Sequence, residues 1–239
     1  DCERTVNAMH ACLLKVPWSG SGKGLNWCLH GFTKPVSNWC ERVLREQGCL
    51  TAEPIYNKVK DFALEFYSDG QGEVRFAGYS VFSTNEHGAY TGNLLASDGQ
   101  IEESIACCLS LEKLTGIREA LRAELASIYG NTYTGYLGVD MMVCRSDKED
   151  GYCVHPCVEI NMRMNMGVVA RLFYDRFVAP GSKGCFAVEY VPDNETLRAR
   201  HEQDVHDYPL TVEQGRLASG YLPLVPVTGK SCYRAYVRI

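Results

Sequence analysis

The segment 158–163 constrains the fold more than any other part of the chain, because its residues alternate strictly between apolar and polar side chains. Successive side chains of a β-strand point to opposite faces, so the alternation predicts a strand. Glu159, Asn161 and Arg163 then share one face, and the apolar residues between them are expected to point into the core. A strand face that carries a carboxylate, an amide and a guanidinium group is suited to holding a ligand.

Residues 139–143 predict the strand before it, with Asp140 between apolar neighbours. A hairpin centred within residues 149–151 places Asp140 opposite Glu159 or Asn161, and directly opposed residues of antiparallel strands share a face. Carboxylate and amide oxygens of this kind suit Mg²⁺, which also takes phosphate oxygens as ligands. The alternative is a solvent-exposed strand face with an Arg–Glu ion pair.

The hairpin register stays open at this stage for two reasons. The loop that joins the two strands is long, and Pro156 interrupts the second strand near its start. A proline cannot donate a hydrogen bond to the neighbouring strand.

Short elements are predicted in the N-terminal part. The apolar run 11–16 predicts a strand that ends at Pro17. Residues 37–47 begin with a candidate N-cap and stop at Gly48, which predicts a helix. Another strand is expected at residues 50–53.

In the middle of the chain the pattern changes to alternation. Phe62, Leu64 and Phe66 lie on one face of the predicted strand, and a turn at residues 68–70 leads into further alternating segments. We expect an antiparallel meander there. Residues 90–93 are expected to form a hairpin turn, with a place near the acceptor substrate as the alternative.

Apolar residues then recur at spacings of three and four from Leu111 to Ile128, which predicts an amphipathic helix that ends at Gly130. Its apolar stripe is expected to lie against the sheet. Residues 233–239 read as a final strand. Helices mixed with antiparallel strands predict the α+β class.

A loop rich in Gly and Ser follows the first strand at residues 19–24, and Lys15 lies on that strand. Small residues let backbone N–H groups surround phosphate oxygens, and a lysine supplies positive charge. The loop is not a Walker A motif, because Lys23 is followed by Gly24, and its evenly spaced glycines depart from G-x-G-x-x-G. A flexible surface turn is the alternative.

The order of these features resembles the ATP-grasp family over about residues 11–175. The order runs from the lysine-bearing strand, the Gly-rich loop and the helix to Glu53-Pro54-Ile55-Tyr56, Asp61-Phe62, Gly138-Val139-Asp140 and finally Glu159-Ile160-Asn161-Met162-Arg163. The most specific part is E-x-N-x-R after a V-D strand. The resemblance implies an ATP-grasp fold, in which two α+β subdomains with antiparallel sheets enclose the nucleotide.

Three regions are expected from this resemblance. They are an N-terminal subdomain with the Gly-rich loop (1–53), a C-terminal subdomain with the metal-binding strands (54–175) and a C-terminal extension packed on this core (176–239).

The resemblance also implies roles for single residues in binding ATP. Lys15 would contact the phosphates, and the loop residues that cover them would be Ser19, Gly20, Ser21, Gly22 and Lys23. Glu53 would accept a hydrogen bond from the adenine amino group, the backbone of Ile55 and Tyr56 would contact the adenine ring, and Asp61 would reach the ribose hydroxyls.

For the metal, the resemblance implies Asp140, Glu159 and Asn161 as ligands of Mg²⁺, with Mn²⁺ as an alternative. Arg163 would face the transferring phosphoryl group or the acyl phosphate, so that Arg163 and Lys15 are the expected catalytic residues. Metal and lysine would offset the charge on the phosphates during transfer.

Composition excludes several other functions. The net charge is −5 and no basic cluster appears, which argues against nucleic-acid binding. No apolar run approaches the ~20 residues that a membrane helix needs, and the first residues, Asp1-Cys2-Glu3-Arg4, have neither the basic nor the apolar region of a signal peptide, so a cytoplasmic location is expected. The twelve cysteines include no C-x-x-C pair, and they are expected to be mostly reduced and buried.

The expected function is the ATP-binding portion of a ligase that forms an acyl phosphate from ATP and a carboxylate, for attack by an amine or another nucleophile. Both substrates would be small molecules, and a homo-oligomer is left open. A kinase with the same fold, or a nucleotide-binding module without turnover, are the alternatives. Family members usually carry a preceding domain and a second phosphate-binding lysine, so the chain is expected to be a piece of a longer protein.

Overall fold

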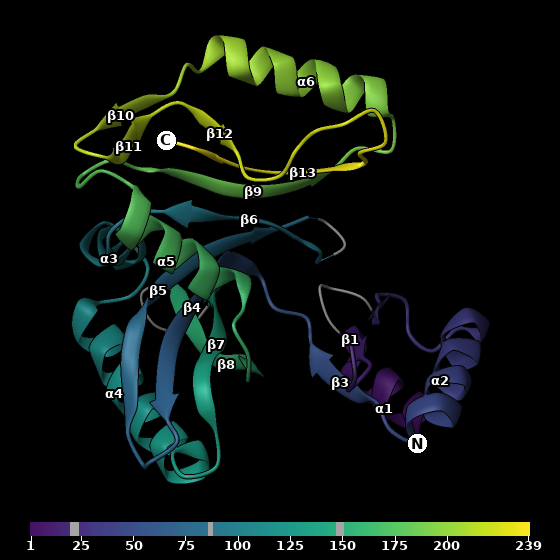
Figure 1. Cartoon of the computed structure of the whole chain (residues 1–239). Helices are drawn as coiled ribbons and strands as arrows, with labels where there is room; N and C mark the ends of the chain where they lie inside the picture. The colour runs from purple at the N-terminus through teal and green to yellow at the C-terminus, as the bar shows by residue number, and fades with distance from the viewer. Residues whose placement is uncertain (20–23, 86–87, 147–150) are drawn as a thin grey trace. The chain divides into compact units, whose positions relative to one another are not determined.

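Three β-sheets organise the chain in the computed structural model, which describes residues 1–19, 24–85, 88–146 and 151–239. The chain divides into two units (Figure 1). Unit 1 comprises Asp1–Asn57 and Thr84–Tyr90, and unit 2 comprises Lys58–Ser83 and Thr91–Ile239. No helix among the described residues is long and apolar enough to cross a membrane.

Unit 1 is a three-stranded antiparallel sheet with two helices. Its elements are α1 (Cys2–Met9), β1 (Cys12–Lys15), β2 (Leu25–Cys28), α2 (Lys34–Gln47) and β3 (Thr51–Pro54), with strand order β2-β1-β3. The alternation in β1 directs Cys12 and Leu14 into a buried cluster that also contains Val6 of α1 and Cys40 of α2. Lys15 therefore lies on the other face of this sheet.

Helix α2 starts earlier than the sequence predicted. It begins at Lys34 after Thr33, whereas the predicted start was Ser37. Pro35 explains the difference, because a proline in the first helical turn fits the required φ angle and loses no intrahelical hydrogen bond. The end at Gly48 is confirmed, since Gly48 adopts φ 78° and its N–H bonds to the carbonyl of Leu44.

Unit 2 is built on an eight-stranded sheet with the order β12-β13-β9-β6-β5-β4-β7-β8. Its elements are β4 (Lys58–Asp69), β5 (Val74–Thr84), β6 (Tyr90–Leu95), α3 (Asp98–Ala106), α4 (Leu111–Tyr129), β7 (Thr134–Arg145), β8 (Tyr152–Asn161), α5 (Met166–Phe177), β9 (Gly184–Tyr190), α6 (Asn194–Asp207), β10 (Thr211–Glu213), β11 (Arg216–Ser219), β12 (Tyr221–Pro223) and β13 (Tyr233–Arg238). Residues 90–93 belong to strand β6, so the predicted hairpin turn there is wrong.

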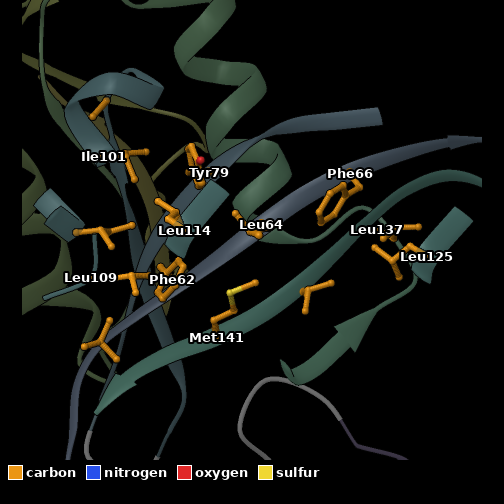
Figure 2. Packing of buried hydrophobic residues seen from close by; sticks show 14 of the residues in the cluster. Phe62, Leu64, Phe66, Tyr79, Ile101, Leu109, Leu114, Leu125, Leu137 and Met141 are labelled. Atoms are coloured by element: carbon orange, nitrogen blue, oxygen red, sulfur yellow. The ribbon is translucent and has the colours of Figure 1, made fainter. Parts of the chain in front are cut away.

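The main core lies between this sheet and the helices α3 and α4. Phe62, Leu64 and Phe66 are all fully buried in it, which confirms the predicted alternation. Figure 2 shows Phe62 and Leu64 among side chains of the same cluster, including Leu114 from α4. Burial of apolar area at this scale is the main stabilising contribution to folding.

The predicted apolar stripe of α4 is buried only over its middle. Leu114 and Leu125 are buried and Ile117 packs against the core, but Leu111 and Ile128 are 47% and 58% exposed. Leu111 is the first residue of α4 and Ile128 the last but one. The helix ends therefore leave two stripe positions in solvent.

Residues beyond 176 complete the sheet. Strands β9, β12 and β13 belong to it, and α6 lies along them (Figure 1). The predicted strand at 233–239 is confirmed as β13. Arg234 is buried on β13 and forms ion pairs of 2.6 Å with Glu189 of β9 and Asp204 of α6, so no buried charge stays uncompensated there.

Candidate functional site

The predicted carboxylates meet on the hairpin of β7 and β8. Asp140 lies directly opposite Glu159, and Gly138 lies opposite Asn161. Of the two registers that the sequence left open, the structure has the one with Glu159. Directly opposed residues of an antiparallel pair share a face, so the two acidic side chains stand side by side.

A chain of hydrogen bonds joins this pair to the arginine. Asn161 donates through Nδ2 to Oδ2 of Asp140 at 3.1 Å, and Arg163 donates through Nη2 to Oδ1 of Asn161 at 2.9 Å. We call Asp140, Glu159, Asn161 and Arg163 the acidic-face cluster. All four residues that the alternation singled out around the predicted metal are therefore brought together.

A bulge in β8 accommodates Pro156 without changing the face. Met142 and Asp140 are two positions apart, while their partners His155 and Glu159 are four apart. The two additional residues preserve the alternation, because side chains repeat with a period of two. The interruption expected at Pro156 therefore breaks the regular strand pairing locally but leaves Glu159 beside Asp140.

The apolar side of β8 differs from the prediction. Ile160 and Met162 are each 36% exposed, although they were expected to point into the core. Ile160 lies opposite Val139, which is fully buried, so its face is the core side of the sheet. Strand β8 is the edge strand of the eight-stranded sheet, however, and no further strand of the described residues pairs with its outer side to extend the core.

Burial and neighbouring charge change the acidity of this face. The pKa of Asp140 is raised from 3.8 to about 7: burial raises it most, the nearby carboxylates of Glu159 and Glu65 raise it further, and the hydrogen bond from Asn161 lowers it. Closely spaced carboxylates disfavour each other's ionised form. A divalent cation would relieve that repulsion.

The donor set fits a hard cation that brings its own oxygen ligands. The described residues contain no group of three or more His, Cys, Asp or Glu side chains arranged to hold a metal. Two carboxylates with one amide are instead the kind of incomplete set that Mg²⁺ accepts, because it retains water and phosphate oxygens.

Glu65 is a second buried carboxylate on this face, and the sequence analysis missed it. It lies on β4 opposite Gly138, is 1% exposed, and accepts hydrogen bonds of 2.9 Å from Ser80 Oγ and Asn165 Nδ2. Burial raises its pKa to about 7, and the two hydrogen bonds oppose that increase. A signal was present in the sequence, because Glu65 stands between Leu64 and Phe66 in the alternating run and therefore points away from the core face. The pairing of β4 with β7 makes this the face of Asp140.

Two glycines allow helix α5 to approach Glu65 closely. A Cβ atom on Gly167 would overlap Oε1 of Glu65, and one on Gly138 would overlap Nδ2 of Asn165. Asn165 also caps α5 by accepting a hydrogen bond of 2.8 Å from the N–H of Val168. Glu65 thereby fixes the turn that directly follows Arg163.

Asp61 lies on β4 opposite Met142, on the same face as Asp140. Its carboxylate forms an ion pair of 2.5 Å with Lys58. Its expected role at the ribose stays a prediction.

In unit 1, the structure brings together Lys15 and Glu53. Their side chains form an ion pair of 2.5 Å on the face of the sheet opposite the buried cluster. Ile55 and Tyr56 follow β3 directly, with Ile55 half-buried and Tyr56 exposed. The expected contacts of these residues with ATP, and a cleft shared by Lys15 and the acidic-face cluster, stay predictions.

Of the predicted phosphate loop at residues 19–24, the structure describes Ser19 and Gly24. Ser19 donates through Oγ to the carbonyl of Val16 at 3.2 Å. Gly20, Ser21, Gly22 and Lys23 lie outside the described residues.

No family model matches this sequence and no curated protein matches it, but solved structures do. The biotin carboxylase domain of the Hydrogenobacter thermophilus 2-oxoglutarate carboxylase, in complex with MgADP, ADP and bicarbonate, is 12% identical, with a TM-score of 0.56 over 99% of this chain and 55% of that one. The N5-carboxyaminoimidazole synthetase of Staphylococcus aureus, complexed with ADP, is 11% identical, with a TM-score of 0.56 over 100% of this chain and 61% of that one.

A third match is the carboxyaminoimidazole ribonucleotide synthase of Aspergillus clavatus, complexed with ATP, which is 13% identical with a TM-score of 0.55 over 98% of this chain and 59% of that one. This chain thus spans 55% to 61% of the length of these three proteins. The similarity extends over almost the whole chain and includes the α+β arrangement of helices and antiparallel strands described above. The chain therefore has the ATP-grasp fold, as the order of its sequence motifs implied.

Proposed function

We propose that this chain is the ATP-binding portion of a ligase that activates a carboxylate with ATP. The observation that carries the proposal is the opposition of Asp140 and Glu159, with Asn161 and Arg163 hydrogen-bonded beside them. The ATP-grasp fold supports it, since the solved structures with this fold include complexes with ATP, ADP and MgADP.

In the proposed reaction, a carboxylate oxygen of the substrate attacks the terminal phosphorus of ATP, and ADP leaves with the electrons of the broken P–O bond. The product is an acyl phosphate. An amine or another nucleophile then attacks its carbonyl carbon, and phosphate leaves. Because the charge shifts between oxygens in both steps, catalysis is mainly a matter of position and electrostatic stabilisation.

The residues of the acidic-face cluster would contribute to position and electrostatic stabilisation in different ways. Asp140, Glu159 and Asn161 would hold Mg²⁺, which when bound supplies positive charge beside the phosphate oxygens. Arg163 follows β8, is exposed to solvent and donates a hydrogen bond to Asn161 that orients its side chain. Its guanidinium group has further N–H donors for a phosphoryl oxygen. Lys15 and Glu53 would contact the nucleotide from unit 1.

A binding experiment on the chain as it stands tests the proposal. MgADP affinity would be measured by isothermal titration calorimetry for the unchanged chain, for Glu159→Gln and for Glu124→Gln. Glu159→Gln keeps the shape of the side chain but removes the charge of a metal ligand. We therefore expect the affinity for MgADP to fall by roughly tenfold or more, as for the loss of a charge-assisted contact. Glu124 is an exposed residue of α4 and serves as the matched control, with affinity unchanged.

Two results would count against this proposal. One is a chain that binds no MgADP at millimolar concentration. The other is a Glu159→Gln variant whose Mg²⁺-dependent affinity equals that of Glu124→Gln. Turnover of the longer protein with carboxylate and amine pools would then separate a ligase from a kinase, since a kinase would release ADP and transfer the phosphoryl group to a hydroxyl without forming an amide.

A further inference from the structure

The β7–β8 hairpin carries a second opposed pair, made of two cysteines. Cys144 of β7 lies directly opposite Cys153 of β8, four positions along β7 from Asp140. Both thiols are free. Cys144 is 1% exposed, whereas Cys153 is exposed to solvent. Four of the twelve cysteines are buried, so the expectation that most of them are buried is wrong.

Their register satisfies the geometric requirement for a disulfide. Directly opposed residues of an antiparallel pair have Cα atoms about 4.5–5.5 Å apart, and disulfides join Cα atoms about 4.4–6.8 Å apart. The two side chains also point to the same face of the sheet. No movement of one strand along the other is needed to bring the sulfur atoms together.

Two further cysteine pairs that lie close together lack one of these conditions. Cys12 and Cys28 are also directly opposed, on β1 and β2, but both are buried, so a dissolved oxidant cannot reach either sulfur. Cys107 and Cys108 have sulfur atoms 3.4 Å apart, but as sequence neighbours their Cα atoms are about 3.8 Å apart, which is below the disulfide range.

We propose that Cys144 and Cys153 form a thiol-oxidation site, at which an oxidised low-molecular-weight thiol such as glutathione disulfide introduces a cross-strand disulfide. The accessible Cys153 is the residue attacked first, and the buried Cys144 is the resolving thiol. This proposal does not depend on the proposed ligase function.

The chemistry proceeds in two exchanges. The Cys153 thiolate attacks one sulfur of glutathione disulfide, which forms a protein–glutathione disulfide and releases one glutathione thiolate. The Cys144 thiolate then attacks the Cys153 sulfur, the mixed disulfide breaks, and a second glutathione thiolate leaves. The two protein thiols lose two electrons and two protons in total, and one glutathione disulfide becomes two glutathione thiols.

The surroundings of Cys144 slow the second exchange. Burial raises the pKa of the Cys144 thiol, the neighbouring Cys153 and Asp61 raise it further, and Lys58 lowers it. Fewer Cys144 thiolates are therefore present at neutral pH, and the thiolate is the reactive form. The mixed disulfide on Cys153 should therefore convert to the Cys144–Cys153 disulfide faster at alkaline pH.

Mass mapping of the whole chain tests this assignment. The native protein is incubated with glutathione disulfide, alkylated, and digested without reduction. We expect one peptide pair linked through Cys144 and Cys153, while Cys12 and Cys28 stay alkylatable only after unfolding. The Cys144→Ser variant should stop at glutathione on Cys153, and Cys153→Ser should leave Cys144 unmodified because it is buried.

Thermal unfolding provides an independent measurement. A link across the hairpin restricts the unfolded chain, so the oxidised protein should have a higher Tm that returns to the starting value with dithiothreitol. Cys153→Ser should show no such shift. Oxidation that links Cys153 to Cys157, or that modifies Cys107 while Cys144 and Cys153 stay unlinked, would overturn the proposal, as would a Cys12–Cys28 link formed under native conditions at the same rate.

Discussion

Asp140 on β7 lies directly opposite Glu159 on β8, with the amide of Asn161 donating to Asp140 at 3.1 Å. This relationship places two carboxylates on one sheet face at a point where burial already disfavours negative charge. The consequences can be measured with and without a bound metal.

The first prediction concerns the pH dependence of nucleotide binding. A metal ligand must be deprotonated, and the pKa of Asp140 is about 7. Its ionised fraction should rise from roughly a tenth at pH 6 to roughly nine tenths at pH 8. MgADP affinity should therefore increase over this range, as measured by calorimetry in buffers of equal ionic strength.

Asp140→Asn is the control for that titration. It removes the carboxylate, so affinity should be lower and its pH dependence reduced to the part contributed by Glu65, whose pKa is also about 7. An unchanged pH profile in Asp140→Asn would show that the titrating group lies elsewhere.

The second prediction concerns stability without metal. The pKa of Asp140 is about 7 in the folded protein against an ordinary value of 3.8, so the folded state holds the proton more tightly. The tighter binding of this proton adds to the free energy of unfolding, and the added stability is fully present below pH 4 and is lost as the pH rises to about 7. Asp140→Asn should therefore be more stable than the unchanged chain at pH 8, by about 1–3 kcal/mol, with little difference at pH 4.

Urea unfolding at the two pH values, in the presence of EDTA, checks both parts. Equal stability of the two proteins at pH 8 would contradict the raised pKa.

The third prediction compares two glycines in helices. Gly167→Ala introduces a Cβ atom that overlaps the carboxylate of Glu65, so it should destabilise the fold by about 1–3 kcal/mol. Gly116→Ala on α4 meets nothing within 4 Å and should stabilise by about 0.5–1 kcal/mol through helix propensity. The opposite signs, measured by urea unfolding, distinguish close packing on Glu65 from a general effect of alanine. Stabilisation by both substitutions would mean that α5 does not pack on Glu65.

The fourth prediction concerns Lys15. If its ammonium group contacts a phosphate, Lys15→Ala should weaken MgADP binding by roughly tenfold or more. The substitution also removes the ion pair with Glu53, so Glu53→Gln is measured beside it to separate the two effects. Lys113→Ala, at an exposed position of α4, is the control and should bind normally. If Lys15→Ala and Lys113→Ala bound MgADP with equal affinity, Lys15 would not be part of the nucleotide site.

The sequence by itself determined the local elements that position the acidic-face cluster. Strict alternation over residues 158–163 fixed which side chains share a face, since the pleat of a strand has a period of two. The end of α2 at Gly48 followed from local chemistry in the same way, because glycine adopts the left-handed conformation that ends a helix. The order of the motifs, with E-x-N-x-R as the most specific of them, implied the ATP-grasp fold that the solved structures bear out.

Only the tertiary structure decided the rest, because the relevant partners are distant in the chain. Glu65 and Asn165 are a hundred positions apart, and no local pattern reveals that a hydrogen bond joins them or that Gly167 must lack a side chain to allow it. The exposure of Ile160 likewise depends on strand order, which makes β8 an edge strand. Alternation sets the direction of a side chain, whereas its burial and its pKa depend on what the rest of the fold places beside it.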